Sequence, residues 1–190
     1  MSILPKDFEG IPQGDTKYLK FEEGENIIRI LSEVIVGYEY WIDDKDGNRK
    51  PVRVETWDEI PDAFKGNKDN RKNAKYFWGM VVYNVNIKNI QILEIKQKGI
   101  MRSIEALDKS KAWGDARDYD IIITKTKTGA EEKDVEYSVM PSPKEEVDEG
   151  IKKAYQDMDI NLMALFKGED PFKNEEVNVD DIPDFDVEKK

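Results

Sequence analysis

The pattern of apolar and polar positions predicts that this chain is built mainly of strands. Apolar and polar residues alternate over 25–31, which places Ile28 and Ile30 on one face of a first strand. The run over 34–42 is β-branched and aromatic throughout, which is typical of a second strand, and Gly37 within it is a candidate bulge or bend. The first part of the chain is therefore expected to form a sheet.

Turn residues separate the second strand from the runs that follow it. An Asp-Gly pair suits the positive backbone angles of a hairpin turn, so residues 49–55 are expected to return beside the second strand. A long polar excursion follows over 56–75, and loops of this length are usually functional or disordered. Two further strands are predicted over 76–85 and 90–97, joined by a short polar turn.

A change from alternation to helical spacing marks the middle of the chain. Apolar residues recur at i, i+4 and i+7 over 100–109, which predicts a short helix. Two more strands are predicted after it, over 119–125 and 135–140. An oligonucleotide/oligosaccharide-binding (OB) barrel has three strands, a short helix and two further strands, and its second and third strands present the ligand surface.

The C-terminal part begins with residues that favour the start of a helix. Ser142 suits an N-cap and Pro143 suits the first helical position. Apolar residues then follow one helical face up to Gly168, with a possible break at Asp159. Residues 169–190 are acidic and poor in apolar side chains, which predicts a disordered tail.

We therefore predict a mainly β protein built on a five-stranded OB-type Greek-key barrel. A short helix is expected between strands three and four, followed by a C-terminal helix and a disordered acidic tail. The expected divisions are an N-terminal arm over 1–16, the OB domain over 17–141, a helical segment over 142–168 and the tail over 169–190.

The distribution of charge matters more than its total. The net charge is -11, which by itself disfavours a nucleic-acid partner because phosphates need cations. However, residues 169–190 hold nine acids and three lysines, a net charge of -6. More than half of the excess negative charge therefore lies in the predicted tail.

Composition removes several classes of chemistry. The chain has no cysteine and no histidine, so it has no disulfide, thiol nucleophile, Cys/His zinc site or imidazole base. We expect no cofactor, no bound metal and no enzymatic activity. The sequence has no apolar run of about eighteen residues and no secretion signal at its start, so we expect a cytoplasmic protein without a membrane partner.

The basic segment over 65–75 is the strongest pointer to a ligand. It carries five positive charges against one negative and runs directly into Tyr76 and Trp78. Cations pair with phosphates and ring faces stack on unpaired bases, which is what a single-stranded nucleic acid needs. The alternative is a solvated lysine-rich loop that leads into a core strand.

The predicted DNA-binding residues combine these cations with the aromatic residues of the strands. Alternation implies that only one face of each strand meets DNA, so roughly half of the rings are expected in the core. The predicted set is Tyr38, Tyr40, Trp41, Arg49, Lys50, Arg53, Trp57, Lys65, Lys68, Arg71, Lys72, Lys75, Tyr76, Trp78 and Tyr83.

Five segments are distinctive in combination: residues 25–32, 36–41, 90–97, 113–114 and 119–123. Together they resemble the single-stranded-DNA-binding proteins of tailed bacteriophages. The resemblance covers about residues 17–141 and implies an OB fold with sequence-tolerant binding of single strands in DNA replication, recombination and repair. It also implies an acidic tail that recruits phage or host replication and recombination proteins.

The end of the predicted tail is similar to the tail tip of bacterial single-stranded-DNA-binding proteins, an acidic run followed by Asp-Ile-Pro-Phe. It differs because an acid separates the proline from the phenylalanine and four residues follow. The candidate partner-binding residues are Asp180, Asp181, Ile182, Pro183, Asp184 and Phe185.

Two other functions remain open at this stage. Asp62, Glu94 and Lys96 have the types and order of a magnesium-dependent nuclease site, although alternation on a solvent face also explains the last two. Alternatively, the helix over 158–166 docks in the groove of a partner in an adaptor protein that does not bind DNA. That helix could also cover one mouth of the barrel or become buried in a homodimer.

Overall fold

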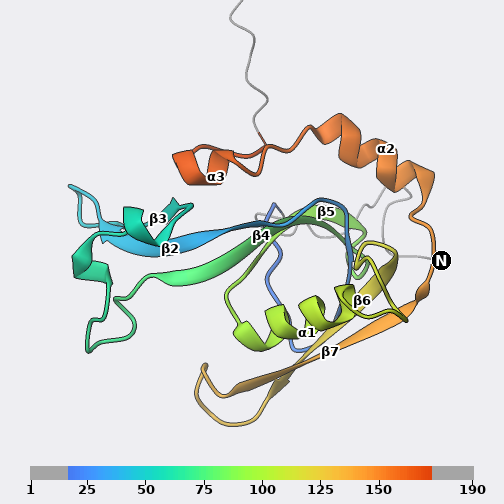
Figure 1. Ribbon diagram of the computed structural model, residues 1–190, viewed down its shortest axis with the longest axis horizontal. Helices are drawn as coiled ribbons and strands as arrows, with labels where there is room; N and C mark the ends of the chain where they lie inside the picture. The colour runs from blue at the N-terminus through green and yellow to red at the C-terminus, as the bar shows by residue number, and fades with distance from the viewer. Residues whose placement is uncertain (1–16, 173–190) are drawn as a thin grey trace, which may run out of the picture.

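The computed structural model describes residues 17–172, which form an antiparallel sheet with helices on both sides (Figure 1). The prediction of a mainly β protein is confirmed. The strands are β1 (Gly24–Ile30), β2 (Ile35–Asp43), β3 (Arg49–Val54), β4 (Lys75–Asn84), β5 (Asn89–Ile95), β6 (Tyr119–Lys127) and β7 (Val135–Lys144). The helices are α1 (Lys98–Asp108), α2 (Glu149–Met158) and α3 (Ala164–Lys167), and the 3-10 turns are η1 (Trp57–Glu59) and η2 (Asp62–Phe64).

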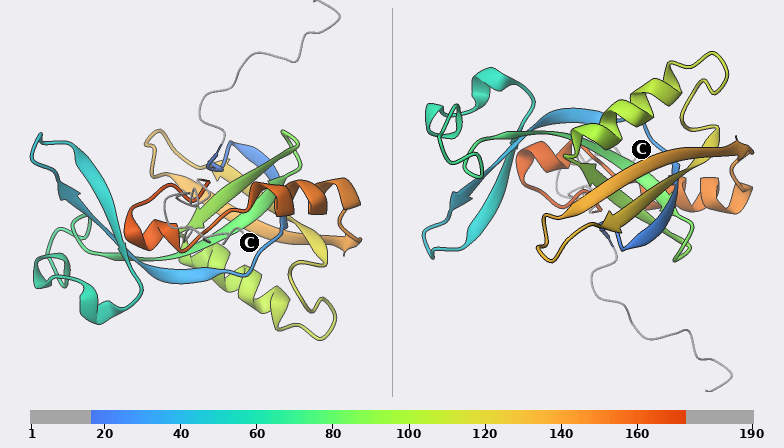
Figure 2. Two further views of the ribbon diagram at one scale, coloured as in Figure 1. Left: turned by 90° about the horizontal axis from the view of Figure 1, so that it is seen from above. Right: turned by 90° about the horizontal axis from the view of Figure 1, so that it is seen from below.

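The sheet branches at β4. One edge of β4 pairs with β2 through residues 75–79 and with β1 through residues 82–84, while the other edge pairs with β5. The β1 branch continues to β6 and β7, and the β2 branch continues to β3. Figures 1 and 2 show the β2–β3 hairpin and the loop after it projecting from one end of the molecule.

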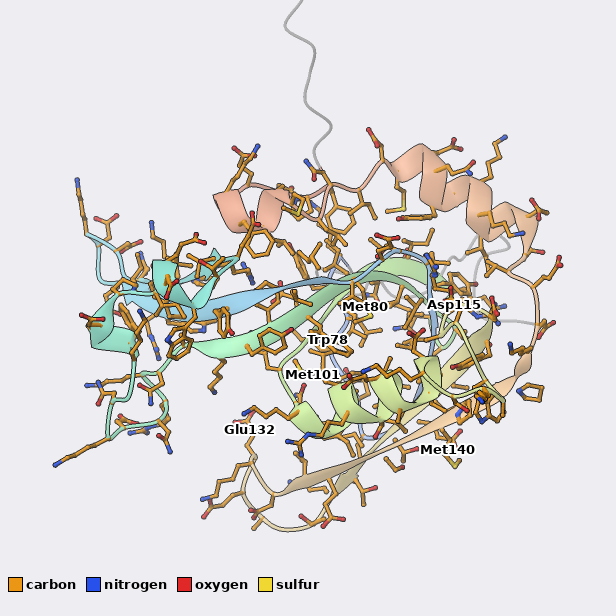
Figure 3. All side chains as sticks on the ribbon, in the orientation of Figure 1. Trp78, Met80, Met101, Asp115, Glu132 and Met140 are labelled. Carbon is orange, nitrogen blue, oxygen red and sulfur yellow. The ribbon has the colours of Figure 1, made fainter. Side chains whose placement is uncertain are left out.

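The main core lies between α1 and the inner face of the sheet. Alternation places Ile28 and Ile30 of β1 on this face, as predicted, and both are buried with Met80 of β4. Ile100 and Ile104 of α1 pack against the same cluster because they are one turn apart on one helical face. Burial of each such side chain contributes about 1.5–3 kcal/mol. Figure 3 shows Trp78, Met80 and Met101 between β4 and α1.

A second, smaller core lies on the opposite face of β4 and β5. Val81 and Ile92 pack there against Leu162 and Leu165 from the C-terminal segment. Both faces of β4 are therefore covered at this point, which explains its continuous apolar run.

The start of the C-terminal helix was predicted wrongly. Ser142 and Pro143 belong to β7, which stays paired with β6 as far as Lys144. A residue before proline is pushed towards extended backbone, so Ser142 favours the strand. The N-cap of α2 is Asp148, whose side chain accepts a hydrogen bond from the Gly150 N–H at 2.8 Å.

The ends of the last two helices were predicted correctly. Asp159 ends α2 with a positive φ of 44°, and Gly168 ends α3 with a φ of 71°. None of the helices within residues 17–172 is long and apolar enough to cross a membrane.

Gly37 is not a bulge. The register between β2 and β4 runs without a shift through Gly37, which lies opposite Phe77. A Cβ atom on Gly37 would lie 2.6 Å from a ring carbon of Phe166 and 2.6 Å from the carbonyl oxygen of Val54. The missing side chain therefore lets α3 approach β2 and places the Phe166 ring 6.0 Å from that of Phe77.

Candidate nucleic-acid interface

The projecting hairpin has one edge that β4 does not cover. β4 begins with Lys75 opposite Glu39, so within the described residues the stretch 40–43 of β2 pairs with β3 alone. The loop between β3 and β4 lies beside this stretch. Its Phe64 ring packs on the Tyr40 ring with the centroids 4.6 Å apart, which buries Tyr40.

The basic loop over 65–75 has a defined local structure. The Asn73 side chain accepts a hydrogen bond from the Asn67 N–H at 2.7 Å and donates one to the Asn67 carbonyl at 3.0 Å. Arg71 donates from its guanidinium to both carboxylate oxygens of Asp69, at 3.0 and 3.1 Å. This hydrogen bonding holds the pKa of Asp69 below its ordinary value. The loop therefore presents its cations from a folded backbone.

The hairpin and this loop enclose a cleft of about 790 Å³, which adjoins a second hollow of about 310 Å³. Trp41, Arg49 and Arg71 line both hollows, and we call their union the Trp41 cleft. The Trp41 side chain is 42% exposed, and the Arg49 guanidinium lies 5.8 Å from the centre of its ring. The cations of the lining are Arg49, Arg71, Lys72, Lys75 and Lys96, and its carboxylates are Glu39, Asp43 and Asp69.

A buried ion network holds the Trp41 ring in place. The indole N–H of Trp41 donates to Glu39 Oε1 at 3.0 Å, and the Lys96 ammonium lies 2.6 Å from the same oxygen. The Glu39 side chain is only 2% exposed. Arg53 lies between Glu39, at 3.0 Å, and Glu94, at 2.9 Å. The negative charges of the two carboxylates and the positive charges of the two cations cancel. The face of the Trp41 ring remains exposed to the cleft.

This network also contains Arg53, which was predicted to contact DNA. Its side chain is mostly buried, and both neighbouring carboxylates compete for its guanidinium. Arg53 therefore contributes to the support of Trp41 through Glu39, and its contact with DNA stays a prediction.

A second group of rings lies on the opposite face of the hairpin. Tyr38 and Tyr76 are cross-strand partners with their ring centroids 5.4 Å apart, and Trp57 meets Tyr38 edge-on at 5.3 Å. The Lys65 ammonium lies 5.7 Å from the centre of the Trp57 ring. Alternation along β2 separates this group from Trp41 because Tyr38 and Trp41 are three residues apart.

The other predicted DNA-binding residues are spread over the molecule. Trp78 is half-buried against the main core, and Tyr83 packs on the second core. Lys50 lines a separate hollow together with residues of α3, and Lys68 is exposed on the basic loop. The structure therefore brings together Trp41 and the predicted cations Arg49, Arg71, Lys72 and Lys75.

Sequence reasoning missed the parts that support the cleft. Neither Glu39 nor Phe64 was predicted there, and Lys96 was considered only for a nuclease. The available signal was Glu39 itself, because a single acid inside a run of aromatic and β-branched residues implies a buried partner.

The residues of the nuclease hypothesis lie in different surroundings. Asp62 is fully exposed on η2, Glu94 is ion-paired with Arg53, and Lys96 is ion-paired with Glu39. Residues 17–172 contain no group of three or more acidic side chains arranged to hold a metal ion.

The predicted arm over 1–16 lies outside the described residues, as do the candidate tail residues Asp180, Asp181, Ile182, Pro183, Asp184 and Phe185. Comparisons of the chain with protein-family models, with curated proteins and with solved structures found no match.

Proposed function

We propose that this protein binds single-stranded DNA with little sequence preference and that the Trp41 cleft is the binding site. The observation that carries the proposal is the excess of cations, five against three carboxylates, around an exposed indole ring in a chain with a net charge of -11. Cations at phosphates supply affinity for any sequence, and a ring face accepts any unpaired base. Base pairs in a duplex hide these faces, so the cleft favours single strands.

The strand pairing supports an OB-type barrel as the framework of this site. β1 pairs with β4, β4 with β5, β1 with β6 and β6 with β7, and α1 connects β5 to β6. These five strands and their helix follow the order of that fold. The β2–β3 hairpin and the loop after it are then an insertion between the first and second barrel strands.

This assignment also explains where the cleft lies. The ligand surface of an OB fold comprises its second and third strands and the loop after its first strand. Lys75 opens β4, Lys96 follows β5, and Trp41 and Arg49 lie on the inserted hairpin. The second barrel strand is β4 in this assignment, whereas the strand that carries Tyr38 was predicted for that place.

We further propose that the protein protects single strands during DNA replication, recombination and repair, and that its acidic C-terminal residues recruit replication proteins. The resemblance of residues 17–141 to phage single-stranded-DNA-binding proteins supports this role, together with the negative charge of residues 173–190.

The test of the proposed function is a titration with a poly-dT oligonucleotide that follows tryptophan fluorescence. We expect poly-dT to quench the emission and duplex DNA of equal length to do so far less, because only unpaired bases stack on Trp41. Trp41→Ala should lower the affinity about tenfold, since stacking of one base contributes about 1–3 kcal/mol. Trp57→Ala is the matched control because it removes a similarly exposed ring, 46% against 42% for Trp41, from the other face. Equal loss in the two variants, or equal quenching by duplex, would contradict the proposal.

Removal of residues 173–190 should tighten DNA binding at low salt by several-fold. This segment has seven acids and three lysines, so it is a tethered competitor for the cations of the cleft. The gain should disappear as salt rises, because exposed charges are screened beyond about 8 Å near physiological ionic strength. The truncation keeps Phe172, which packs on Tyr18. An unchanged affinity of the truncated protein at every salt concentration would show that the segment does not compete.

Phe185→Ala in the full chain should weaken capture of a replication protein without changing DNA affinity.

A further inference from the structure

The face of the hairpin opposite the Trp41 cleft carries a continuous apolar surface. Val34, Val36 and Tyr38 lie at alternate positions in β2 and the residue before it. Val36 and Tyr38 lie opposite Trp78 and Tyr76 of β4, so these side chains share one face. Val36 and Trp57 are each 46% exposed, and Val36 lies opposite Trp78 in the register. We call this surface the apolar stripe, and it comprises Val34, Val36, Tyr38, Trp57, Tyr76 and Trp78.

One end of the stripe opens into a groove against α1. The groove has a volume of about 310 Å³, and Val34, Trp78 and Ile104 contribute to its apolar wall. This volume is at the lower end of the roughly 300–1,000 Å³ of ligand pockets, which suits one large side chain of a docked segment. The charged residues of its lining are the acids Glu33, Glu105, Asp108 and Asp115 and the single cation Arg117.

The acids at the groove are not all paired with cations among residues 17–172. Arg117 is held by Asp115, with their charged atoms 2.6 Å apart, and Lys109 pairs with Glu105. Glu33 and Asp108 line the groove without an ion pair of their own among these residues, although Asp108 accepts a hydrogen bond from the Ala116 N–H at 3.0 Å. The groove therefore combines an apolar interior with a negative rim.

The other end of the stripe is also acidic. The turn that carries Trp57 contains Asp58 and Glu59, and Asp62 follows on the next turn. Lys65 at this end already lies over the Trp57 ring and 3.9 Å from Asp62. A nucleic acid would meet repulsion at both ends, and a two-fold copy of the stripe would oppose acids to acids.

We propose that the apolar stripe docks a segment of a partner protein in which apolar side chains are flanked by lysine or arginine. The apolar side chains enter the groove beside Trp78, and the flanking cations pair with the carboxylates at its rim. The Trp41 ring lies on the other face of the hairpin from the stripe, and the stripe and the Trp41 cleft share no lining residue, so we expect the partner and single-stranded DNA to bind at the same time.

The test uses the full-length protein and a capped synthetic peptide in which a Leu-Phe pair has two lysines on each side. We expect saturable binding that shifts the Trp78 indole and the Val34 and Val36 methyl resonances in NMR spectra. Replacement of the four lysines by glutamates, or of Leu-Phe by Ser-Ser, should abolish these shifts.

Matched variants separate the stripe from the acidic C-terminal residues, which attract any cationic peptide. Val36→Arg should weaken peptide binding about tenfold, as expected for a central interface contact, and should leave poly-dT affinity unchanged. Met140→Arg adds the same charge at a 55% exposed strand residue of β7, shown in Figure 3, and should have little effect. Glu33→Lys should likewise weaken binding, whereas Glu136→Lys on β7 should not.

Several outcomes would overturn the proposal. Equal peptide affinity in the Val36→Arg and Met140→Arg proteins would show that the stripe does not bind the peptide. Poly-dT that shifts the stripe resonances would assign this face to DNA. Self-association in sedimentation experiments that Val36→Arg abolishes would make a second copy of the chain the occupant.

Discussion

Neutralisation of four cations of the Trp41 cleft is expected to weaken binding of poly-dT about a hundredfold near physiological salt. The variant changes Arg49, Arg71, Lys72 and Lys75 to glutamine and keeps Lys96, which supports the buried Glu39 carboxylate. For each phosphate contact that is lost, about 0.7 counterion stays on the single strand instead of being released on binding. The slope of log affinity against log salt should therefore become shallower by about 2–3.

The measurement is a set of fluorescence titrations at several salt concentrations. The control variant changes Lys98, Arg102, Lys127 and Lys153 to glutamine, which lowers the net charge equally at exposed residues elsewhere. This variant should keep most of the salt slope. If both variants lose affinity and slope alike, the dependence reflects the overall charge of the protein, and the cleft is not the site.

Gly37→Ala is expected to lower the free energy of unfolding by about 3 kcal/mol, the upper part of the usual cost of overpacking. The added methyl group would lie 2.6 Å from both the Phe166 ring and the Val54 carbonyl oxygen. The ring can move, but the carbonyl belongs to the paired backbone of β3 and cannot yield without loss of strand pairing. The hairpin or α3 must therefore shift.

Urea denaturation measures this change, and Gly99→Ala is the matched control. Gly99 lies in α1 with no heavy atom within 4 Å of an added Cβ, so alanine there should be neutral or stabilising by up to about 1 kcal/mol. In a Phe166→Ala background the penalty at Gly37 should shrink but persist, because the Val54 carbonyl remains. A Gly37→Ala protein as stable as the parent would show that α3 does not pack against β2 as described.

Local sequence signals predicted most elements well. The hairpin between β2 and β3, the turn between β4 and β5, the helix α1 and the ends of α2 and α3 all depend on residues close together in the chain. Periodicity, turn propensity and the left-handed conformations at Asp159 and Gly168 are local properties, so a single sequence contains them. The start of α2 was an exception because pairing with β6 keeps Ser142 and Pro143 extended.

The candidate site was predicted only in part. The sequence located the basic loop and the aromatic strands, and it required that some of the rings be buried. Period-two alternation shows that Tyr38 and Tyr40 share a face and that Trp41 faces the other way, but it does not show which face meets the cleft. Phe64 decided the outcome for Tyr40 by covering its ring.

By itself, the sequence determined most of the strands and helices, the absence of cysteine and histidine chemistry, and the concentration of cations beside aromatic residues. Only the tertiary structure decided which side chains become neighbours. Glu39, Arg53 and Lys96 come from three different strands or strand ends, and their ion pairs hold Trp41 open to the cleft. α3 reaches Gly37 from more than a hundred residues away and covers one face of the sheet. Such long-range contacts depend on how strands pair and pack, and residue spacing along the chain does not encode them.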